Sequence, residues 1–79
     1  MAVVLDDFVS VVSDLFSSET NVNAQTRFRD LEEWSSMQAL ILIAAVDEHF
    51  GVTLPEKEFR SAVNVQDLFN LTNTLQENA

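Results

Sequence analysis

The segment that most constrains the fold of this chain is the apolar run after Ser35, because helix start and stop signals enclose it. Ser35 is expected to cap this helix, and Gln38, three residues later, completes a capping box of the S-x-x-Q type. Gly51 is expected to end the helix at the C′ position, which predicts a helix over residues 36–50. Ser36 then occupies the first helical position, where free backbone N–H groups and the helix dipole favour a phosphate. Ser36 is therefore either a neighbour of the cap or the carrier of a phosphorylated group.

The chain before this helix predicts one further helix and a long loop. Residues from about 3 to 16 show the period of an amphipathic helix. Its apolar face holds Leu5, Phe8, Val12 and Leu15. Residues 17–33 lack clear periodicity and are rich in Ser, Thr and Asn, so they are predicted to form the first loop. Phe28 and Leu31 are expected to pin this loop to the core.

The chain after Gly51 predicts two more helices. Pro55 suits the first turn of a short third helix, and Asn64 is expected to cap a last helix over about residues 65–76. The inner face of the last helix is expected to hold Val65, Leu68, Phe69, Thr72 and Leu75. No segment alternates with the period of two that a half-buried strand requires. The prediction is a single all-α domain over residues 1–79, a four-helix bundle with a long first loop and a short third helix.

Charge and composition exclude several classes of function. Thirteen acids and four bases give a formal net charge of -9, the wrong sign for a protein that binds nucleic acid or an anionic membrane. The acidity favours association with basic surfaces, although it also serves solubility alone. The chain has no cysteine and one histidine, His49, so no metal site is expected. No membrane span and no signal peptide are expected, and the absence of cysteine fits a reducing, cytoplasmic location.

The predicted helix over residues 36–50 holds more apolar residues than one core-facing stripe requires. Helical phasing assigns a complete stripe to Ala39, Leu42, Ile43, Val46 and Phe50. Four apolar residues then remain near the side that Asp47 and Glu48 mark as wet: Met37, Leu40, Ile41 and Ala44. Either the first loop or the third helix covers them, or they form a patch for a partner or ligand beside Ser36.

The order and spacing of several motifs resemble the acyl carrier proteins. The matching segments are Phe28, Asp30-Leu31, Ser35-Ser36-Met37, Asp47-Glu48-His49-Phe50-Gly51-Val52, Leu54-Pro55 and Val65-Gln66-Asp67-Leu68. That family consists of small acidic four-helix domains that carry an acyl or aminoacyl group as a thioester on a phosphopantetheine arm. The arm is attached to the serine of an Asp-Ser-Leu motif at the start of the second helix. The resemblance, which covers nearly the whole chain, implies an acyl-carrier-like fold with covalent 4′-phosphopantetheine on Ser36 and no catalytic residue.

Some residues depart from the family pattern. Ser35 replaces the aspartate before the attachment serine, and Met37 replaces leucine. Gln38 and Ile41 stand where the family often has acids that meet basic groups on partners. These departures indicate recognition that is apolar at its centre and acidic at its rim. The residues expected to contact partners are Glu33, Ser35, Met37, Leu40, Ile41, Ala44, Asp47 and Glu48.

The resemblance implies a stand-alone, monomeric carrier that is not an enzyme. Its expected partners are a phosphopantetheinyl transferase and enzymes that load, transfer or condense acyl groups, with basic or apolar docking surfaces. The departures favour a specialised lipid, polyketide-like or other secondary pathway. The alternative is a helical interaction module that has the carrier fold without the modification, in which Ser36 is only part of a cap.

Overall fold

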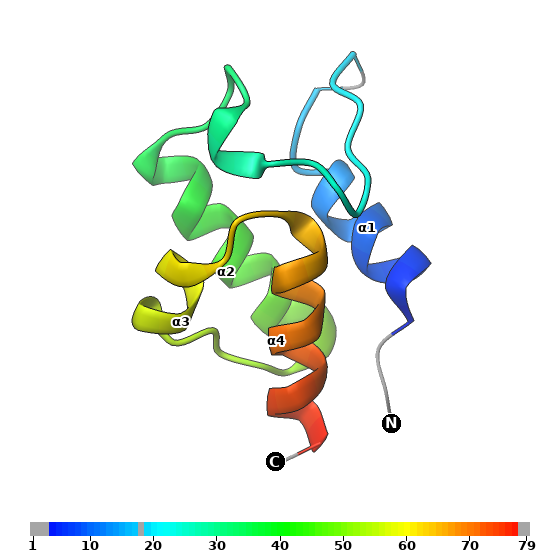
Figure 1. Cartoon of the computed structure of the whole chain (residues 1–79), viewed down its shortest axis with the longest axis vertical. Coiled ribbons are helices and arrows are strands. Elements are labelled where there is room, and N and C mark those ends of the chain that lie inside the picture. The colour runs from blue at the N-terminus through cyan, green and yellow to red at the C-terminus, as the bar shows by residue number, and fades with distance from the viewer. Residues whose placement is uncertain (1–3, 18, 78–79) are drawn as a thin grey trace.

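The computed structural model describes residues 4–17 and 19–77, and all regular structure within them is helical. The α-helices are α1 (Leu5–Ser13), α2 (Ser36–Phe50), α3 (Glu56–Ser61) and α4 (Val65–Glu77) (Figure 1). A single 3-10 turn, η1 (Phe28–Asp30), interrupts the long first loop. This arrangement confirms the predicted all-α fold with a long first loop and a short third helix. Within the described residues, no helix combines the length and apolarity needed to cross a membrane.

Helices α1, α2 and α4 contact one another and enclose the core (Figure 1). The ring of Phe8 in α1 joins all three, because its centroid lies 5.5 Å from that of Phe50 in α2 and 5.9 Å from that of Phe69 in α4. The largest fully buried side chains are Phe8, Phe28, Leu42, Leu68, Val12, Val46, Val65 and Thr72. The predicted apolar faces of the first and last helices are therefore confirmed in their central residues.

The first helix is shorter than predicted. It ends at Ser13, three residues before the expected end near residue 16, and residue 3 lies outside the described residues. The N–H groups of Leu15 and Phe16 donate to the carbonyls of Val12 and Ser13, each at 3.1 Å. These bonds span three residues, which tightens the chain out of the α-helical path. The tightening brings Phe16 into the core, where it is buried.

The start of α4 carries a reciprocal cap. The Asn64 side-chain oxygen accepts from the N–H of Asp67 at 2.9 Å, which confirms Asn64 as the cap. In return, the Asp67 carboxylate accepts from the N–H of Val63 at 2.8 Å and from that of Asn64 at 3.4 Å. This is the capping-box arrangement with an aspartate in the third helical position.

The first loop also binds the start of α4. The N–H of Val65 donates to the carbonyl of Thr26 at 3.1 Å, and the N–H of Gln66 donates to that of Ala24 at 2.8 Å. Phe28, at the start of η1 within the same loop, is fully buried. The loop is thus held in place by backbone hydrogen bonds and by the predicted aromatic anchor.

The corner between α2 and α3 fixes the position of the short third helix. Gly51 adopts the left-handed conformation, with φ 67°, and its N–H donates to the carbonyl of Asp47 at 2.9 Å. Val52 is buried directly after it, as expected for the hydrophobic contact of such a cap. Pro55 lies just before α3 with an extended ψ of 140°, so the prediction that it belongs to the first turn is wrong by one residue. Its carbonyl still accepts from Phe59 N–H at 2.9 Å, as an N-cap residue does.

Candidate functional site

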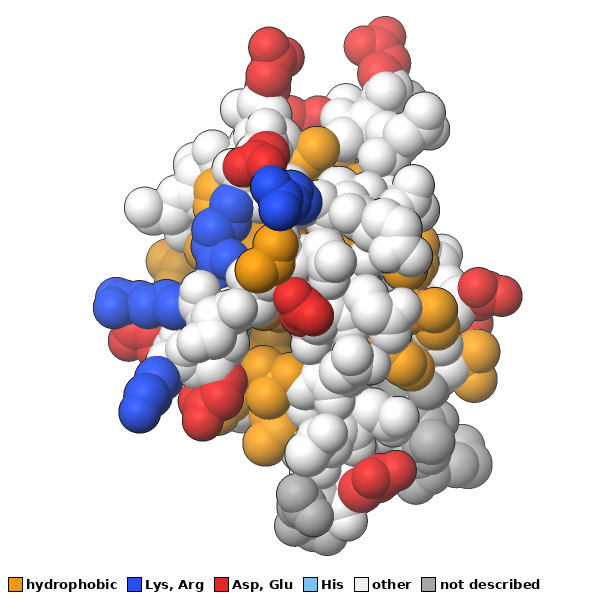
Figure 2. Space-filling model, viewed as in Figure 1, with side chains coloured by type: hydrophobic (Ala, Val, Ile, Leu, Met, Phe, Trp, Pro, Cys, Tyr) orange, Lys and Arg blue, Asp and Glu red, His pale blue; other side chains and the backbone are white. Residues whose placement is uncertain are grey.

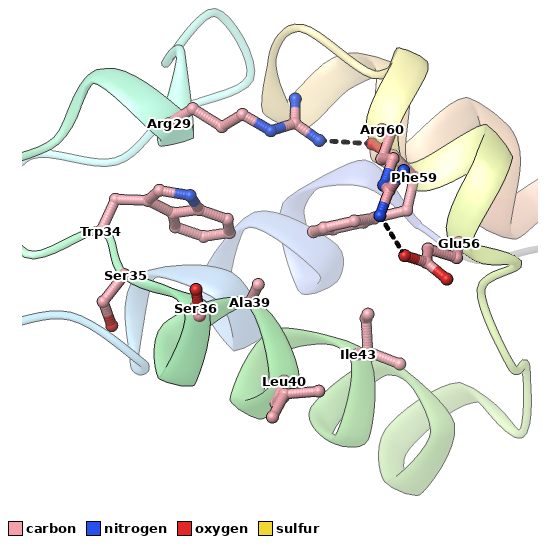
Figure 3. A pocket seen from close by; sticks show the side chains of 10 residues that line it. All are labelled: Arg29, Trp34, Ser35, Ser36, Ala39, Leu40, Ile43, Glu56, Phe59 and Arg60. Carbon is pink, nitrogen blue, oxygen red and sulfur yellow. Dashed lines mark hydrogen bonds and ion pairs between the residues drawn. The ribbon is translucent and has the colours of Figure 1, made fainter.

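Two adjacent serines have different roles at the start of α2. The Ser35 hydroxyl oxygen accepts from the N–H of Gln38 at 3.1 Å, which confirms Ser35 as the N-cap. Ser36 is the first residue of α2 and is exposed. Figure 3 shows the Ser36 hydroxyl pointing toward the side of α2 on which Trp34 lies, whereas the Ser35 hydroxyl points away. Ser35 therefore maintains the turn, and Ser36 presents its oxygen to the surroundings.

The backbone around Ser36 suits a negatively charged group. Within the described residues, the N–H groups of Ser36 and Met37 have no hydrogen-bond acceptor. They stand at the positive end of the dipole of a helix of 15 residues. The first turn of α2 contains no acid that would repel an anion. A phosphate group bonded to the Ser36 oxygen would find unpaired donors and a favourable dipole there.

The predicted capping box forms only in its first half. The side-chain amide of Gln38 does not return to the Ser35 backbone but donates to the Leu15 carbonyl at 2.8 Å. Leu15 lies in the tightened end of α1, where carbonyls have lost their helical partners. The prediction of a reciprocal box at Ser35 is therefore wrong in this half: among the described residues the Ser35 N–H donates no hydrogen bond to the Gln38 side-chain oxygen, and the Gln38 side chain is held by its tertiary bond to Leu15. The bond ties the end of α1 to the first turn of the helix that carries Ser36.

An open pocket of about 790 Å³ lies beside Ser36 (Figure 3). Its lining comprises Ser35, Ser36, Ala39, Leu40 and Ile43 from α2 and its start, with Trp34, Arg29, Glu56, Phe59 and Arg60 opposite. The ring centroid of Trp34 lies 5.1 Å from that of Phe28 and 6.3 Å from that of Phe59. Trp34 therefore packs the loop onto the core and also forms a wall of the pocket. The volume lies within the range of small-molecule sites, about 300–1,000 Å³.

Arg29 closes the pocket on the side of α3 and was not singled out by sequence reasoning. Its guanidinium donates to the carbonyl of Phe59 at 2.6 Å and to that of Ala62. The guanidinium carbon also lies 4.8 Å from the ring centre of Phe28 and 5.2 Å from that of Phe59. These contacts fasten η1 to the end of α3. No local pattern reveals them, because the acceptors lie 33 and 30 residues further along the chain.

The apolar residues that phasing left outside the core are on the surface. Met37 is 66%, Leu40 64% and Ile41 42% exposed. Ala44 is exposed too, as are the flanking acids Asp47 and Glu48. The alternative that the first loop or α3 covers these residues is therefore wrong. Met37, Leu40, Ile41 and Ala44 are hereafter the apolar patch of α2.

The core-facing stripe of α2 contains one residue more than predicted. Leu42 and Val46 are buried as predicted, and Ala39, Ile43 and Phe50 are partly buried and packed against the core. Ala45, which phasing left out of the stripe, is buried as well. Its small side chain gives little signal in a pattern of large apolar residues.

Glu33 is engaged within the first loop. Its carboxylate accepts from the backbone N–H of Ser17 at 3.0 Å, from the Ser17 hydroxyl at 2.8 Å and from the Thr20 hydroxyl. The Thr20 hydroxyl, followed by the hydroxyl and N–H of Ser17, holds the pKa of Glu33 below its ordinary value of 4.5. The expected role of Glu33 in partner binding stays a prediction, and the structure gives this carboxylate an additional role in closing the loop. Among the described residues, His, Asp and Glu form no group of three suited to a metal ion.

Comparison with protein families places the chain in a known class. A family model described as the phosphopantetheine attachment site matches residues 6–77. The chain belongs to this family. No curated protein and no solved structure matched the chain. This phosphopantetheine-binding chain therefore has a carrier role for tethered acyl groups, and its cofactor is covalently attached 4′-phosphopantetheine.

The family match also defines the general chemistry of the carrier. Carrier domains of this type are generally non-catalytic, and they interact with phosphopantetheinyl transferases and with biosynthetic enzymes. The geometry around Ser36 is consistent with this chemistry, because it offers an exposed oxygen, free N–H groups and an adjoining pocket. The residues present therefore fit a phosphodiester-linked arm.

Proposed function

We propose that Ser36 is the attachment serine of a single carrier domain that spans residues 1–79. The observation that carries the proposal is the exposed Ser36 at the open, positive end of α2, within a chain that matches the phosphopantetheine attachment family. The carrier would hold an acyl or aminoacyl group as a thioester and deliver it to partner enzymes. The absence of cysteine supports a reducing, cytoplasmic setting, which stays a prediction.

The residues of this chain would act by holding and orienting the arm. The unpaired N–H groups of Ser36 and Met37 would donate to the phosphodiester, and Ser35 would keep the turn in place. Trp34 would limit the arm on one side of its origin. The arm itself supplies the thiol that forms the thioester. No acid, base or nucleophile of this chain is required, since partner enzymes supply the chemistry.

The partner surface would centre on the apolar patch of α2. Its exposure supports a contact surface, because a small monomer seldom leaves large apolar side chains clustered in water without a role. Asp47 and Glu48 would form an acidic rim at the far end, and Ser35 with Glu33 would lie at the near end. Partners with apolar docking surfaces and basic edges fit this arrangement. The lack of acids in the first turn of α2 supports a specialised pathway with dedicated partners.

The direct test is intact-protein mass after incubation with coenzyme A and a phosphopantetheinyl transferase. The wild-type chain should gain the mass of one arm, and Ser36→Ala should gain none while retaining its helical circular dichroism. Ser35→Ala is the matched control, since it removes a neighbouring hydroxyl but leaves the acceptor. Modification of Ser36→Ala, or a wild-type chain that several transferases leave unmodified, would refute the assignment.

One observation favours a second candidate function. Serine replaces the family's aspartate at position 35, which removes a carboxylate that could meet a basic group on a transferase. A chain that no transferase modifies, yet whose apolar patch still binds a protein, would be an interaction module with the carrier fold. The mass measurement separates the two functions.

A further inference from the structure

The pocket beside Ser36 carries more positive than negative charge, although the whole chain has a formal net charge of -9. Arg29 and Arg60 line it together with a single acid, Glu56. Figure 2 shows the Lys and Arg side chains gathered on one side of the molecule, over η1 and α3. In the neighbouring cleft, Arg27 joins Arg29 and Arg60, together with a single acid, Asp30. An anion that enters the pocket would therefore meet an attractive local field, despite the acidity of the protein.

Arg29 is a half-buried cation that has no carboxylate partner in the part of the chain that the structure describes. The sole ion pair found within the described residues joins Glu56 and Arg60, and both of these side chains are 74% exposed. A guanidinium has five N–H donors, and the carbonyls of Phe59 and Ala62 engage only part of the Arg29 set. Burial of a charge is unfavourable unless an opposite charge or hydrogen bonds compensate it. A carboxylate in the pocket would supply the missing counter-ion.

The remaining lining is apolar and leads from Ser36 toward these arginines. Trp34 and Phe59 present aromatic rings on one side, and Ala39 and Ile43 present aliphatic side chains on the side of α2 (Figure 3). Arg60 extends along the edge of the pocket toward Glu56 in the same view. This lining suits a ligand with an apolar stem and a charged end.

We propose that the pocket receives a tethered acyl group that ends in a carboxylate, as in the half-thioester of a dicarboxylic acid. The stem of this cargo lies between Trp34, Phe59 and Ile43, and its carboxylate meets Arg29 and Arg60. The inference rests on the proposed function, because the cargo reaches the pocket from Ser36. One other anion is available to the same arginines, the phosphodiester of the arm, and the experiment must separate the two.

The test compares matched cargoes on the full chain. Ser36 is loaded from coenzyme A thioesters with malonyl, succinyl, glutaryl or adipyl groups, and with neutral acyl groups of equal length. Hydroxylamine then cleaves each thioester, and the same thioester on free pantetheine corrects for its intrinsic reactivity. A docked cargo is protected from cleavage. Trp34, the only tryptophan of the chain, reports occupancy of the pocket through its fluorescence.

At least one dicarboxylic cargo should be protected roughly two- to fivefold more than its neutral match, as expected for a partly exposed charge pair. The excess protection should fall as salt rises, because exposed charges are screened. Arg60→Gln should abolish the excess, and Glu56→Gln should increase it by removing a competing carboxylate. Lys57→Gln is the matched control, since it removes a positive charge from α3 without touching the pocket lining.

Three results would overturn the inference. Equal protection of neutral and dicarboxylic cargoes would show that the pocket does not select an anion. If Arg60→Gln and Lys57→Gln reduce the excess protection equally, the effect comes from the net charge of the protein and not from the pocket. The arm without cargo could also change the fluorescence of Trp34. If Arg60→Gln removes this change as fully as it does for the loaded arm, the bound anion is the phosphodiester. A chain that accepts no arm at Ser36 refutes the proposed function itself, which is a separate outcome.

Discussion

Substitution of Leu40 by glutamate tests whether the apolar patch of α2 is a docking surface. Complete burial of a leucine or isoleucine side chain stabilises a fold by about 1.5–3 kcal/mol. Leu40 is 64% exposed, so about a third of that contribution, roughly 0.5–1 kcal/mol, is lost in Leu40→Glu. Ile41 is 42% exposed, and Ile41→Glu should cost more, roughly 0.9–1.7 kcal/mol. Leu40 is therefore the better probe, because its cost to the fold is smaller.

The assay combines a thermal melt with the kinetics of modification. A loss of 1 kcal/mol lowers the melting temperature of a domain this small by about 4–8 °C, so Leu40→Glu should melt roughly 2–8 °C below wild type. At a temperature where both are folded, its kcat/KM with a phosphopantetheinyl transferase should fall about tenfold or more. The reason is that a charge would be buried at an apolar contact.

The control for this experiment is Val4→Glu. Val4 is also an exposed apolar residue, 58% exposed, but it lies before α1 rather than on α2. This variant adds the same charge and should keep the wild-type kcat/KM. A loss of several kcal/mol in Leu40→Glu would show that the patch belongs to the core. Equal kinetics for Leu40→Glu, Val4→Glu and wild type would remove the patch from the transferase contact.

Three further predictions concern the ends of α2 and the first loop. Ser35→Asp keeps a capping side chain and adds a carboxylate, so at low salt it should speed modification by a transferase with a basic docking surface. An unchanged rate of modification at low salt would contradict a role for charge at position 35. Gly51→Ala should destabilise the fold by about 1–2 kcal/mol in urea titrations, because φ is 67°, in the left-handed region that disfavours a Cβ. No neighbouring atom lies within 4 Å of an added Cβ, so no steric clash adds to this cost, and Gly51→Asn should cost less. Glu33 has a lowered pKa, so its stabilising contribution is present above pH 4.5 and is lost as the pH falls through the lower, folded-state pKa. The melting temperatures of wild type and Glu33→Gln should therefore converge as the solution is acidified, and a constant difference would refute this linkage.

Local signals in the sequence predicted the structure wherever the interacting groups lie within a few residues. The Ser35 cap, the left-handed Gly51 and the Asn64 cap all depend on atoms within four residues, and all are confirmed. Helical phasing also placed Leu40 outside the core stripe, although it left open whether another element covers this residue, and the structure shows Leu40 exposed. The same reasoning identified Ser36 as the exposed first residue of its helix.

Features that depend on distant partners were not predictable in the same way. The amide of Gln38 binds the carbonyl of Leu15, 23 residues earlier, instead of completing the local capping box. Arg29 closes the pocket through carbonyls 30 and 33 residues away. Glu33 binds Ser17 across the loop, 16 residues away. In each case a polar side chain forms a hydrogen bond with a group that only the tertiary fold brings near, so the pocket and its charge emerge from the structure alone.

The two capped helices differ in what their first amides face. The amides of Val65 and Gln66 at the start of α4 are occupied by carbonyls of the first loop, whereas those of Ser36 and Met37 at the start of α2 have no acceptor within the described residues. Hydrogen exchange at Val65 and Gln66 therefore reports how often the loop detaches from α4, not how often the helix frays. The loop thus blocks one helix start as an anion site and leaves the other open beside the serine.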